Sequence, residues 1–253
     1  MRRIKRFLKS PTATMLTFVL AAGLLLFSSI GGARAALTYF SETYVSRVQM
    51  SNIGVTLLEN GKEISKRDYN KTSDGTWNES TGVLLGNMLE KGEEFKIGKK
   101  YKEELNVRNS GTIDQYVRVS IYKYWVKKDD KQQTLSPNLI DLNLVNVGSD
   151  WLLDKSASTD ERTVLYYSKL LGEGETTSLF ADTIKVDKMV ATKVTQYPVE
   201  GKKNTIRTVY DYDGMQFCVE AKVDAVQDHN AEDAVWSAWG RRVTVDNETL
   251  SLR

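Results

Sequence analysis

Apolar and polar residues alternate with a period of two along most of the chain beyond residue 50. This period is typical of β-strands that have one buried and one solvated face. It predicts a strand over residues 52–58, followed by a tight hairpin turn at Asn60-Gly61, because both turn residues tolerate positive φ. Residues 66–80 are polar and rich in turn-forming types, and this composition predicts a surface loop.

The clearest predicted hairpin covers residues 101–125, with its turn at Asn109-Ser110-Gly111-Thr112. Beyond the turn, three apolar residues fall on one face of the strand: Val117, Val119 and Ile121. Four residues with polar groups fall on the other face: Tyr116, Arg118, Ser120 and Tyr122. The pattern predicts a pair of antiparallel strands with one face in the core and one face in solvent.

Three later segments complete the predicted strands. Residues 135–146 fit either a short helix or a strand. Residues 163–186 predict a strand, a glycine-rich turn and a second apolar stretch. A last strand pair is predicted over residues 205–210 and 215–226, around an acidic turn that ends at Gly214.

One helix is predicted near the C-terminus. Asn230 is placed to cap its start and Gly240 to end it. Trp236 and Trp239 lie three residues apart, and we expect them to pack the helix against the strands. With few prolines and no Ser/Gly-rich linker, the pattern predicts one all-β domain, an antiparallel β-sandwich with a short C-terminal helix and loop insertions.

The first 35 residues differ from the rest of the chain. Five basic residues and no acidic one occupy the first ten positions, and an apolar run follows over residues 15–30. This run is shorter than the ~20 residues that a membrane-spanning helix needs. Ala33 and Ala35 are small residues of the kind that a signal peptidase reads, so we predict cleavage before Ala36. Residues 1–35 are thus a predicted signal peptide and residues 36–253 a secreted domain; an uncleaved signal-anchor is the alternative.

Cleavage changes the charge balance of the protein. Residues 1–35 hold six of the 35 basic residues and none of the 33 acidic ones, which leaves 29 basic against 33 acidic residues. A mildly acidic chain is not expected to bind nucleic acid. Cys218 is the single cysteine, so no intramolecular disulfide can form. It falls on the polar face of its strand, where it is either a bystander or the site of an intermolecular bridge.

The sequence offers little catalytic chemistry. His229 is the single histidine, and there is no H-E-x-x-H zinc motif, no G-x-S-x-G elbow and no phosphate-binding loop. Asp211 and Asp213 resemble the first part of a calcium loop without its remaining ligands, so a weak calcium site stays an alternative. We therefore predict that the protein is not an enzyme, with no catalytic residues, no cofactor and no metal site.

One segment near the N-terminus and three later segments of the sequence resemble a known family. Residues 31–44, GGARAALTYFSETY, resemble the signal peptides that the SipW-type signal peptidase processes. Residues 95–125, 164–180 and 219–240 are similar to segments of the TasA/camelysin family of exported biofilm-matrix proteins of Gram-positive bacteria. The resemblance implies a jelly-roll sandwich, secretion to the extracellular matrix or cell surface, and assembly into fibres.

The leading hypothesis is a secreted structural protein that forms surface or biofilm-matrix fibres. Residues 36–50 would form a donor strand that completes the sheet of a second copy. Its apolar contacts would come from Leu37, Tyr39, Phe40, Tyr44, Val45 and Val48. The same residues could instead be the first strand of their own sheet. Expected partners are the SipW-type signal peptidase, further copies of the chain and other matrix or cell-wall components.

Two further functions are weighed against fibre formation. The first is a cell-surface binding module or adhesin that recognises a polymer through exposed aromatic residues, with Tyr116, Tyr122 and Tyr124 as the binding face. The second is a metalloendopeptidase, a label that the camelysin resemblance carries and that a single histidine does not support.

Overall fold

The computed structural model describes residues 11–12, 15–16, 18–22, 52–71, 77–80, 82–86, 88–89, 92–198 and 206–253. The chain divides into two compact units, Met1–Met50 and Ser51–Arg253. In the first unit the described residues are helical, and no helix among the described residues is long and apolar enough to cross a membrane. The predicted cleavage residues and the predicted assembly strand lie outside the described residues.

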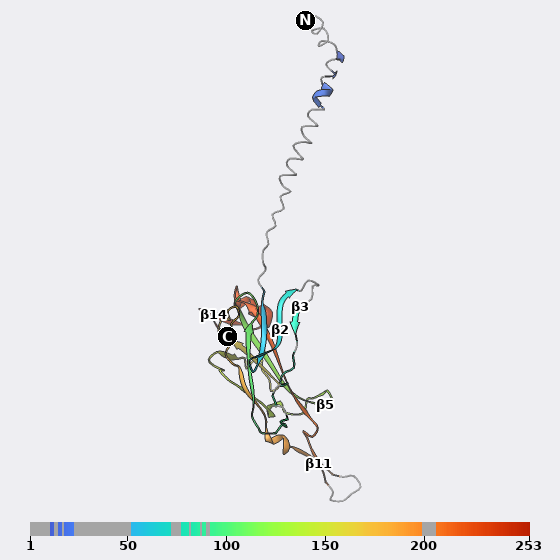
Figure 1. The fold of residues 1–253 in the computed structure, drawn as a ribbon, viewed down its shortest axis with the longest axis vertical. Helices are drawn as coiled ribbons and strands as arrows, with labels where there is room; N and C mark the ends of the chain where they lie inside the picture. Colours follow the sequence, from blue (N-terminus) through green and yellow to red (C-terminus); the bar gives the residue numbers. More distant parts are fainter. Residues whose placement is uncertain are drawn as a thin grey trace. The chain divides into compact units, whose positions relative to one another are not determined.

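The second unit is an antiparallel β-sandwich (Figure 1). The first sheet has the order β3-β2-β1-β4-β10-β7, with strands Trp77–Ser80, Lys62–Lys71, Gly54–Glu59, Tyr101–Asn109, Ala181–Val186 and Ile140–Leu144. The second has the order β13-β5-β9-β8, with strands Gln216–Gln227, Gln115–Lys127, Arg162–Tyr167 and Trp151–Leu153; β6 (Asp130–Gln132) also pairs with β5. Two hairpins are separate from these sheets: β11 (Val194–Pro198) with β12 (Ile206–Tyr210), and β14 (Val243–Asp246) with β15 (Thr249–Leu252).

The strand pairs are nested in a jelly-roll-like way. The innermost pair, β8 with β9, lies in the second sheet; the next, β7 with β10, lies in the first; and the next, β5 with β13, lies again in the second. Such alternation results when a long antiparallel hairpin is rolled into a two-layer sandwich. The predicted all-β sandwich with one short C-terminal helix, α3 (Ala231–Trp239), is confirmed.

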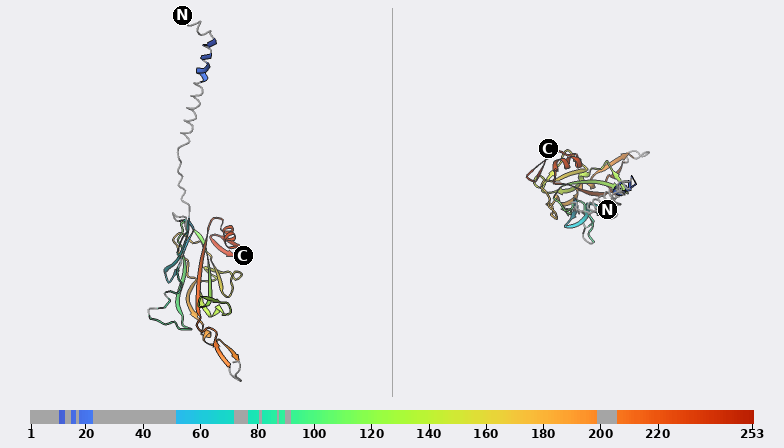
Figure 2. Two further views of the ribbon diagram at one scale, coloured as in Figure 1. Left: turned by 90° about the vertical axis from the view of Figure 1, so that its right-hand side faces the viewer. Right: turned by 90° about the horizontal axis from the view of Figure 1, so that it is seen from above.

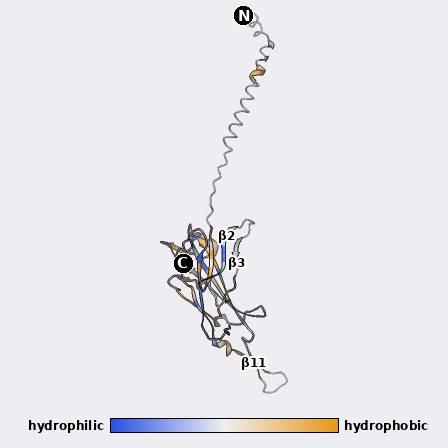
Figure 3. Ribbon diagram, viewed as in Figure 1, coloured by the Kyte–Doolittle hydropathy of each residue, from blue (hydrophilic) through white to orange (hydrophobic). Residues whose placement is uncertain are grey.

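The main core lies between the two sheets. Trp151 is fully buried there, with its ring 5.4 Å from that of Phe180 and 5.1 Å from that of Tyr167. The inward residues of β4 and β5 pack in the same cluster, as the period-two pattern predicts. Figure 3 shows hydrophobic and hydrophilic residues interleaved through the strands of the sandwich.

A second apolar cluster covers the outer face of β5 and β9. Here α3 and the β14–β15 hairpin pack over Tyr116, Tyr166 and Val164. Trp239 of α3 lies edge-on against Tyr166, with ring centroids 5.5 Å apart. The sequence predicted a solvated face here, and that prediction is wrong for Tyr116, which is 2% exposed.

The Asn60-Gly61 hairpin is confirmed. Asn60 and Gly61 have φ values of 50° and 77°, and Glu59 pairs with Lys62 on either side of the turn. The predicted loop over residues 66–80 is wrong, because β2 continues to Lys71 and pairs with β3. Polar residues can form strands at the edge of a sheet, where neither face needs to be buried.

The predicted hairpin over residues 101–125 is also wrong in its pairing. Both strands exist, but β4 belongs to the first sheet and β5 to the second. Residues 110–114 cross between the layers, which are ~10 Å apart in a sandwich. Each strand therefore points its apolar residues into the core from a different side, and the apolar pattern is the same as in a hairpin.

Two later predictions are corrected in the same way. The segments predicted as a last strand pair do not pair with each other: β12 pairs with β11, and β13 pairs with β5. The two apolar stretches of residues 163–186 form β9 and β10, which lie in different sheets. The ambiguous residues 135–146 form a short 3-10 helix, η1 (Pro137–Leu139), followed by β7.

The C-terminal helix has the predicted limits with one difference in its capping. Gly240 ends the helix in the left-handed region at φ 66°. Asn230 occupies the cap position at φ 52°, but its side chain accepts no capping hydrogen bond. Trp239 packs inward as predicted, whereas Trp236 is 45% exposed and stacks on the guanidinium of Arg242 at 4.1 Å.

Candidate functional site

The second sheet ends in a strand with a free edge. β13 pairs with β5 along its whole length, from Gln216 opposite Val126 to Gln227 opposite Gln115. No strand among the described residues pairs with the other edge of β13. An unpaired edge presents a row of backbone N–H and C=O groups that another strand can bind.

A groove of about 810 Å³ runs along this edge, beside the half of β13 that begins at Gln216. Its opposite wall is formed by β1, β2 and the segment that follows β3. The lining is largely apolar and includes Val55, Leu57, Ile64, Leu84, Leu85, Phe217 and Val219. The sandwich is therefore open along one side, between the free edge of one sheet and the inner face of the other.

The groove reaches both faces of β13. Phe217 and Val219 point to the core side of the strand, whereas Cys218 and Glu220 point to the outer side. A strand added at this edge would alternate in the same way. Its inward side chains would meet apolar residues of both sheets, and its outward side chains would lie beside polar residues of β13.

The segment that follows β3 forms part of the groove wall, and a hydrogen bond to a buried carboxylate of β1 holds it in place. The backbone N–H of Leu85 donates to Glu59 Oε1 at 2.6 Å. Gly82 lies against β2 so closely that an added Cβ would stand 2.0 Å from the carbonyl oxygen of Ile64. Both contacts position the wall that faces β13.

A second buried carboxyl group, that of Glu103, lies beside Glu59. Glu103 on β4 is 1% exposed and Glu59 is 2% exposed. Burial raises the pKa of Glu103 to about 8, with further contributions from its hydrogen bond to Glu59 and from the charge of Glu59. Neither Glu103 carboxyl oxygen has a donor among the described residues unless one of the two acids is protonated. Glu103 therefore holds its proton at neutral pH, and its hydrogen bond to Glu59 depends on that proton.

The three tyrosines of the predicted binding face do not stay together. Tyr116 is covered by α3 and the β14–β15 hairpin, whereas Tyr122 and Tyr124 are half-buried and line the groove. Tyr124 donates a hydrogen bond to Glu220, which raises the pKa of Tyr124 to about 12. Next to this pair, burial and then the charge of Glu220 raise the pKa of the Cys218 thiol.

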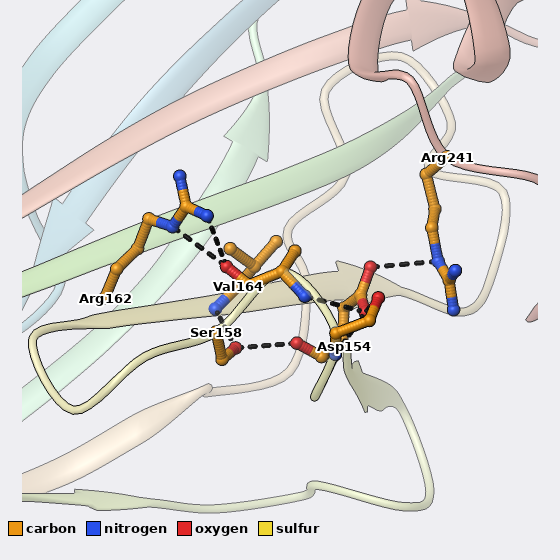
Figure 4. A network of polar contacts seen from close by, with 7 residues as sticks. Asp154, Ser158, Arg162, Val164 and Arg241 are labelled. Carbon is orange, nitrogen blue, oxygen red and sulfur yellow. Dashed lines mark hydrogen bonds and ion pairs between the residues drawn. The ribbon is translucent and has the colours of Figure 1, made fainter.

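A polar network beside β9 joins the segment after β8 to the segment after α3 (Figure 4). The carboxylate of Asp154 is 1% exposed and forms an ion pair with Arg241 at 2.9 Å. Its Oδ1 atom also accepts from the backbone N–H and the hydroxyl of Ser156. Arg162 donates two bonds to the Ala157 carbonyl, at 2.6 and 2.9 Å. The hydrogen bonds of Asp154 Oδ1 and the ion pair with Arg241 together hold the segment after β8 in place.

No group of three or more His, Cys, Asp or Glu side chains is placed to hold a metal within the described residues. His229 is exposed at the start of α3, away from the groove. Asp211 of the predicted acidic turn accepts a hydrogen bond from Thr195 at 2.5 Å and Asp213 is exposed. Cys218 lies near the start of β13 and His229 beyond its end, so almost the whole strand separates them.

The sequence indicated Tyr122 and Tyr124 but missed the groove beside them. The opposite wall comes from residues more than 100 positions before β13, and no local pattern links the two. A scan against protein-family models, a search of curated proteins and a search of solved structures each found no match.

Proposed function

We propose that this protein is a secreted structural protein whose copies join head to tail into surface or matrix fibres by strand donation. The observation that carries the proposal is the free edge of β13 above an apolar groove. Strand addition to such an edge gains main-chain hydrogen bonds and fills the groove with alternate side chains. A contact between different surfaces of identical copies does not close on itself, so it propagates a filament.

The donor in this proposal is residues 36–50 of a second copy. Its second half has one mostly apolar side, formed by Tyr44, Ser46, Val48 and Met50, and one mostly polar side, formed by Val45, Arg47 and Gln49. The apolar side would fill the space between the sheets. Arg47 would lie on the side of Glu220, where opposite charges favour the pairing. Fifteen extended residues span roughly 50 Å, which is ample for the edge of one strand.

Two alternatives make different predictions. If residues 36–50 pair with β13 of their own copy, the groove is filled internally and the protein stays monomeric. If the protein is instead a polymer-binding module, Tyr122 and Tyr124 would be its binding residues, since Tyr116 is buried. In that case binding would be lost when these two tyrosines are replaced by alanine, and the oligomeric state would not change.

The test uses purified protein that begins at Ala36. Deletion of residues 36–45 should abolish fibres seen by electron microscopy and leave the sandwich folded by circular dichroism. A synthetic peptide of residues 36–50 should then bind the shortened protein in a calorimetric titration, while a scrambled peptide should not. Ala221→Arg, which places a charge in the groove, should prevent peptide binding. Undiminished fibres from the deletion would rule out strand donation by this segment.

A mixing experiment separates the donor from the acceptor. The deletion variant keeps the groove, and the Ala221→Arg variant keeps the donor segment. Neither should form fibres alone, whereas a mixture of the two should give heterodimers in sedimentation velocity. Internal pairing of residues 36–50 predicts a monomer for the unaltered protein that begins at Ala36, so that protein is run beside the mixture.

A further inference from the structure

The β11–β12 hairpin projects from one end of the sandwich with no covering element among the described residues (Figures 1 and 2). Every residue of β11 is exposed. Tyr197 and Tyr210 are 54% and 56% exposed, and Val194 and Val209 are also largely accessible. A two-stranded hairpin of this kind is at best marginally stable in water, and exposed aromatic residues on it commonly mark a binding surface.

The hairpin is basic. Its described residues, 193–198 and 206–210, include Lys193 and Arg207 and no acidic residue. Over the whole segment 193–210, four basic residues stand against Glu200: Lys193, Lys202, Lys203 and Arg207. Lys193 and Arg207 are both exposed. The occupant of this surface should therefore be acidic and should offer apolar contacts to the tyrosines.

The opposite end of the sandwich has that chemistry. β13 begins with Gln216 at the end of the sandwich that carries the β11–β12 hairpin, and it ends at the opposite end, beside Gln115. At that opposite end the turns after β4, β9 and β13 lie close to the β14–β15 turn. Six exposed carboxylates lie there, none of them ion-paired within the described residues: Asp114, Glu173, Asp228, Asp233, Asp246 and Glu248. The charges of Glu248 and Asp228 both raise the pKa of the buried Tyr116, after the larger effect of burial, so both carboxylates lie within electrostatic range of that side chain.

Three basic residues at this end form ion pairs with carboxylates. Lys169 pairs with Asp150 at 2.7 Å, Arg241 with Asp154 at 2.9 Å and Arg253 with Glu232 at 3.4 Å. Arg242 stacks on Trp236, which is itself partly exposed and can meet an aromatic side chain. The surface is thus acidic with an apolar component, the complement of the hairpin.

We propose that the β11–β12 hairpin of one copy binds the acidic end of a second copy, as a second contact along the fibre. The inference rests on the proposed strand donation for its direction. The donor segment precedes β1, which begins at the acidic end beside Gly111, and the acceptor groove begins at the hairpin end of β13. A donor that runs antiparallel to β13 leaves the groove at the hairpin end, and so brings the acceptor's hairpin to the donor's acidic end.

The test is a pair of charge reversals in protein that begins at Ala36, which contains the whole compact unit Ser51–Arg253. One variant carries Lys193→Glu and Arg207→Glu on the hairpin; the other carries Asp233→Lys and Glu248→Lys at the acidic end. All four side chains are exposed, so both variants should fold. Each alone should need about a tenfold higher concentration to form fibres at low salt, because like charges then face each other. An equal mixture should restore assembly, since each reversed surface meets its complement.

The outcomes distinguish this inference from strand donation. If deletion of residues 36–45 abolishes fibres and the reversals have no effect, the hairpin contact is wrong and strand donation stands. If the deletion has no effect but the reversals act and the mixture rescues them, the hairpin contact stands without strand donation. Loss of binding to anionic phosphatidylglycerol vesicles, with fibres unchanged, would assign the hairpin to a lipid surface and overturn the proposal. Tyr197→Ser with Tyr210→Ser should weaken assembly at any salt concentration, as the apolar contact is insensitive to screening.

Discussion

Glu103 on β4 shares a hydrogen bond with Glu59 on β1, and the two carboxyl groups are buried together behind the groove wall. Deprotonation of Glu103 would bury a negative charge beside Glu59, so the fold is less stable once that proton is lost. Because Glu59 also accepts from the backbone of Leu85, the protonation of this pair and the position of the wall are linked.

The first prediction concerns the pH dependence of stability. The pKa of Glu103 is about 8 in the folded chain and 4.5 without the fold, so the folded state holds a proton that the unfolded state releases. The free energy of unfolding should therefore fall as pH rises from about 5 to 8, with a slope of up to about 1.4 kcal/mol per pH unit from this group. Urea unfolding at intervals of one pH unit measures the slope.

Glu103→Gln should flatten this slope and stabilise the protein at pH 8, because the amide needs no proton. The matched control is Glu104→Gln, whose side chain is partly exposed and pairs with Lys102 at 2.9 Å on the other face of the same strand. The control should keep the slope of the original protein. Parallel slopes for all three proteins would contradict the raised pKa of Glu103.

The second prediction concerns the Asp154 network. Asp154→Ala removes a buried partner of Arg241 and the acceptor of the Ser156 hydroxyl, so we expect a loss of about 3–5 kcal/mol in the free energy of unfolding. Asp141→Ala is the control, because its pair with Lys185 at 3.0 Å is partly exposed and should contribute about 1 kcal/mol or less. Chemical denaturation measures the free energy of unfolding of both variants. Equal losses would show that burial does not determine how much an ion pair stabilises this fold.

The sequence predicted which residues form strands far better than it predicted which strands pair. Period-two alternation fixes the buried face of β4 and β5, and those faces are correct at Val107 and Val117. The same alternation fits a hairpin or a crossing between sheets, since both bury one face of each strand. The turn at Asn60-Gly61 was predictable because its backbone angles favour particular residues.

The candidate site was predictable only in fragments. Tyr122 and Tyr124 face outward as alternation requires, but their place in a groove depends on β1 and β2, which are distant in the sequence. Tyr116 follows the same alternation and is nevertheless buried, because α3 and β14 cover it from more than 110 residues away. A free strand edge is a property of the sheet order, and no local pattern encodes it.

The third prediction tests the shape of the groove wall. Gly82→Ala would place a Cβ 2.0 Å from the Ile64 carbonyl oxygen, a clash with backbone that can be relieved only by moving the wall. We expect weaker binding of the 36–50 peptide, by about tenfold, if the moved wall forfeits roughly 1–2 kcal/mol of packing. Gly86→Ala is the control, since its nearest contact would be an ordinary 3.6 Å. Equal peptide affinities for the two variants would show that the position of this wall does not affect peptide binding.

The last prediction uses the single cysteine as a reporter of the groove. Burial and the charge of Glu220 raise the pKa of Cys218, so less thiolate is present at pH 8 than in a free cysteine. Its alkylation by iodoacetamide should be slow at pH 8 and should still accelerate above pH 9. Glu220→Gln should speed the reaction severalfold at pH 8, whereas Asp129→Asn, an exposed change in the β5–β6 turn, should not. Because Cys218 lies on the free-edge strand, the 36–50 peptide should slow alkylation further when it binds. An unchanged rate at saturating peptide would place the peptide elsewhere on the protein, and a rate that levels off by pH 8 would contradict the raised pKa.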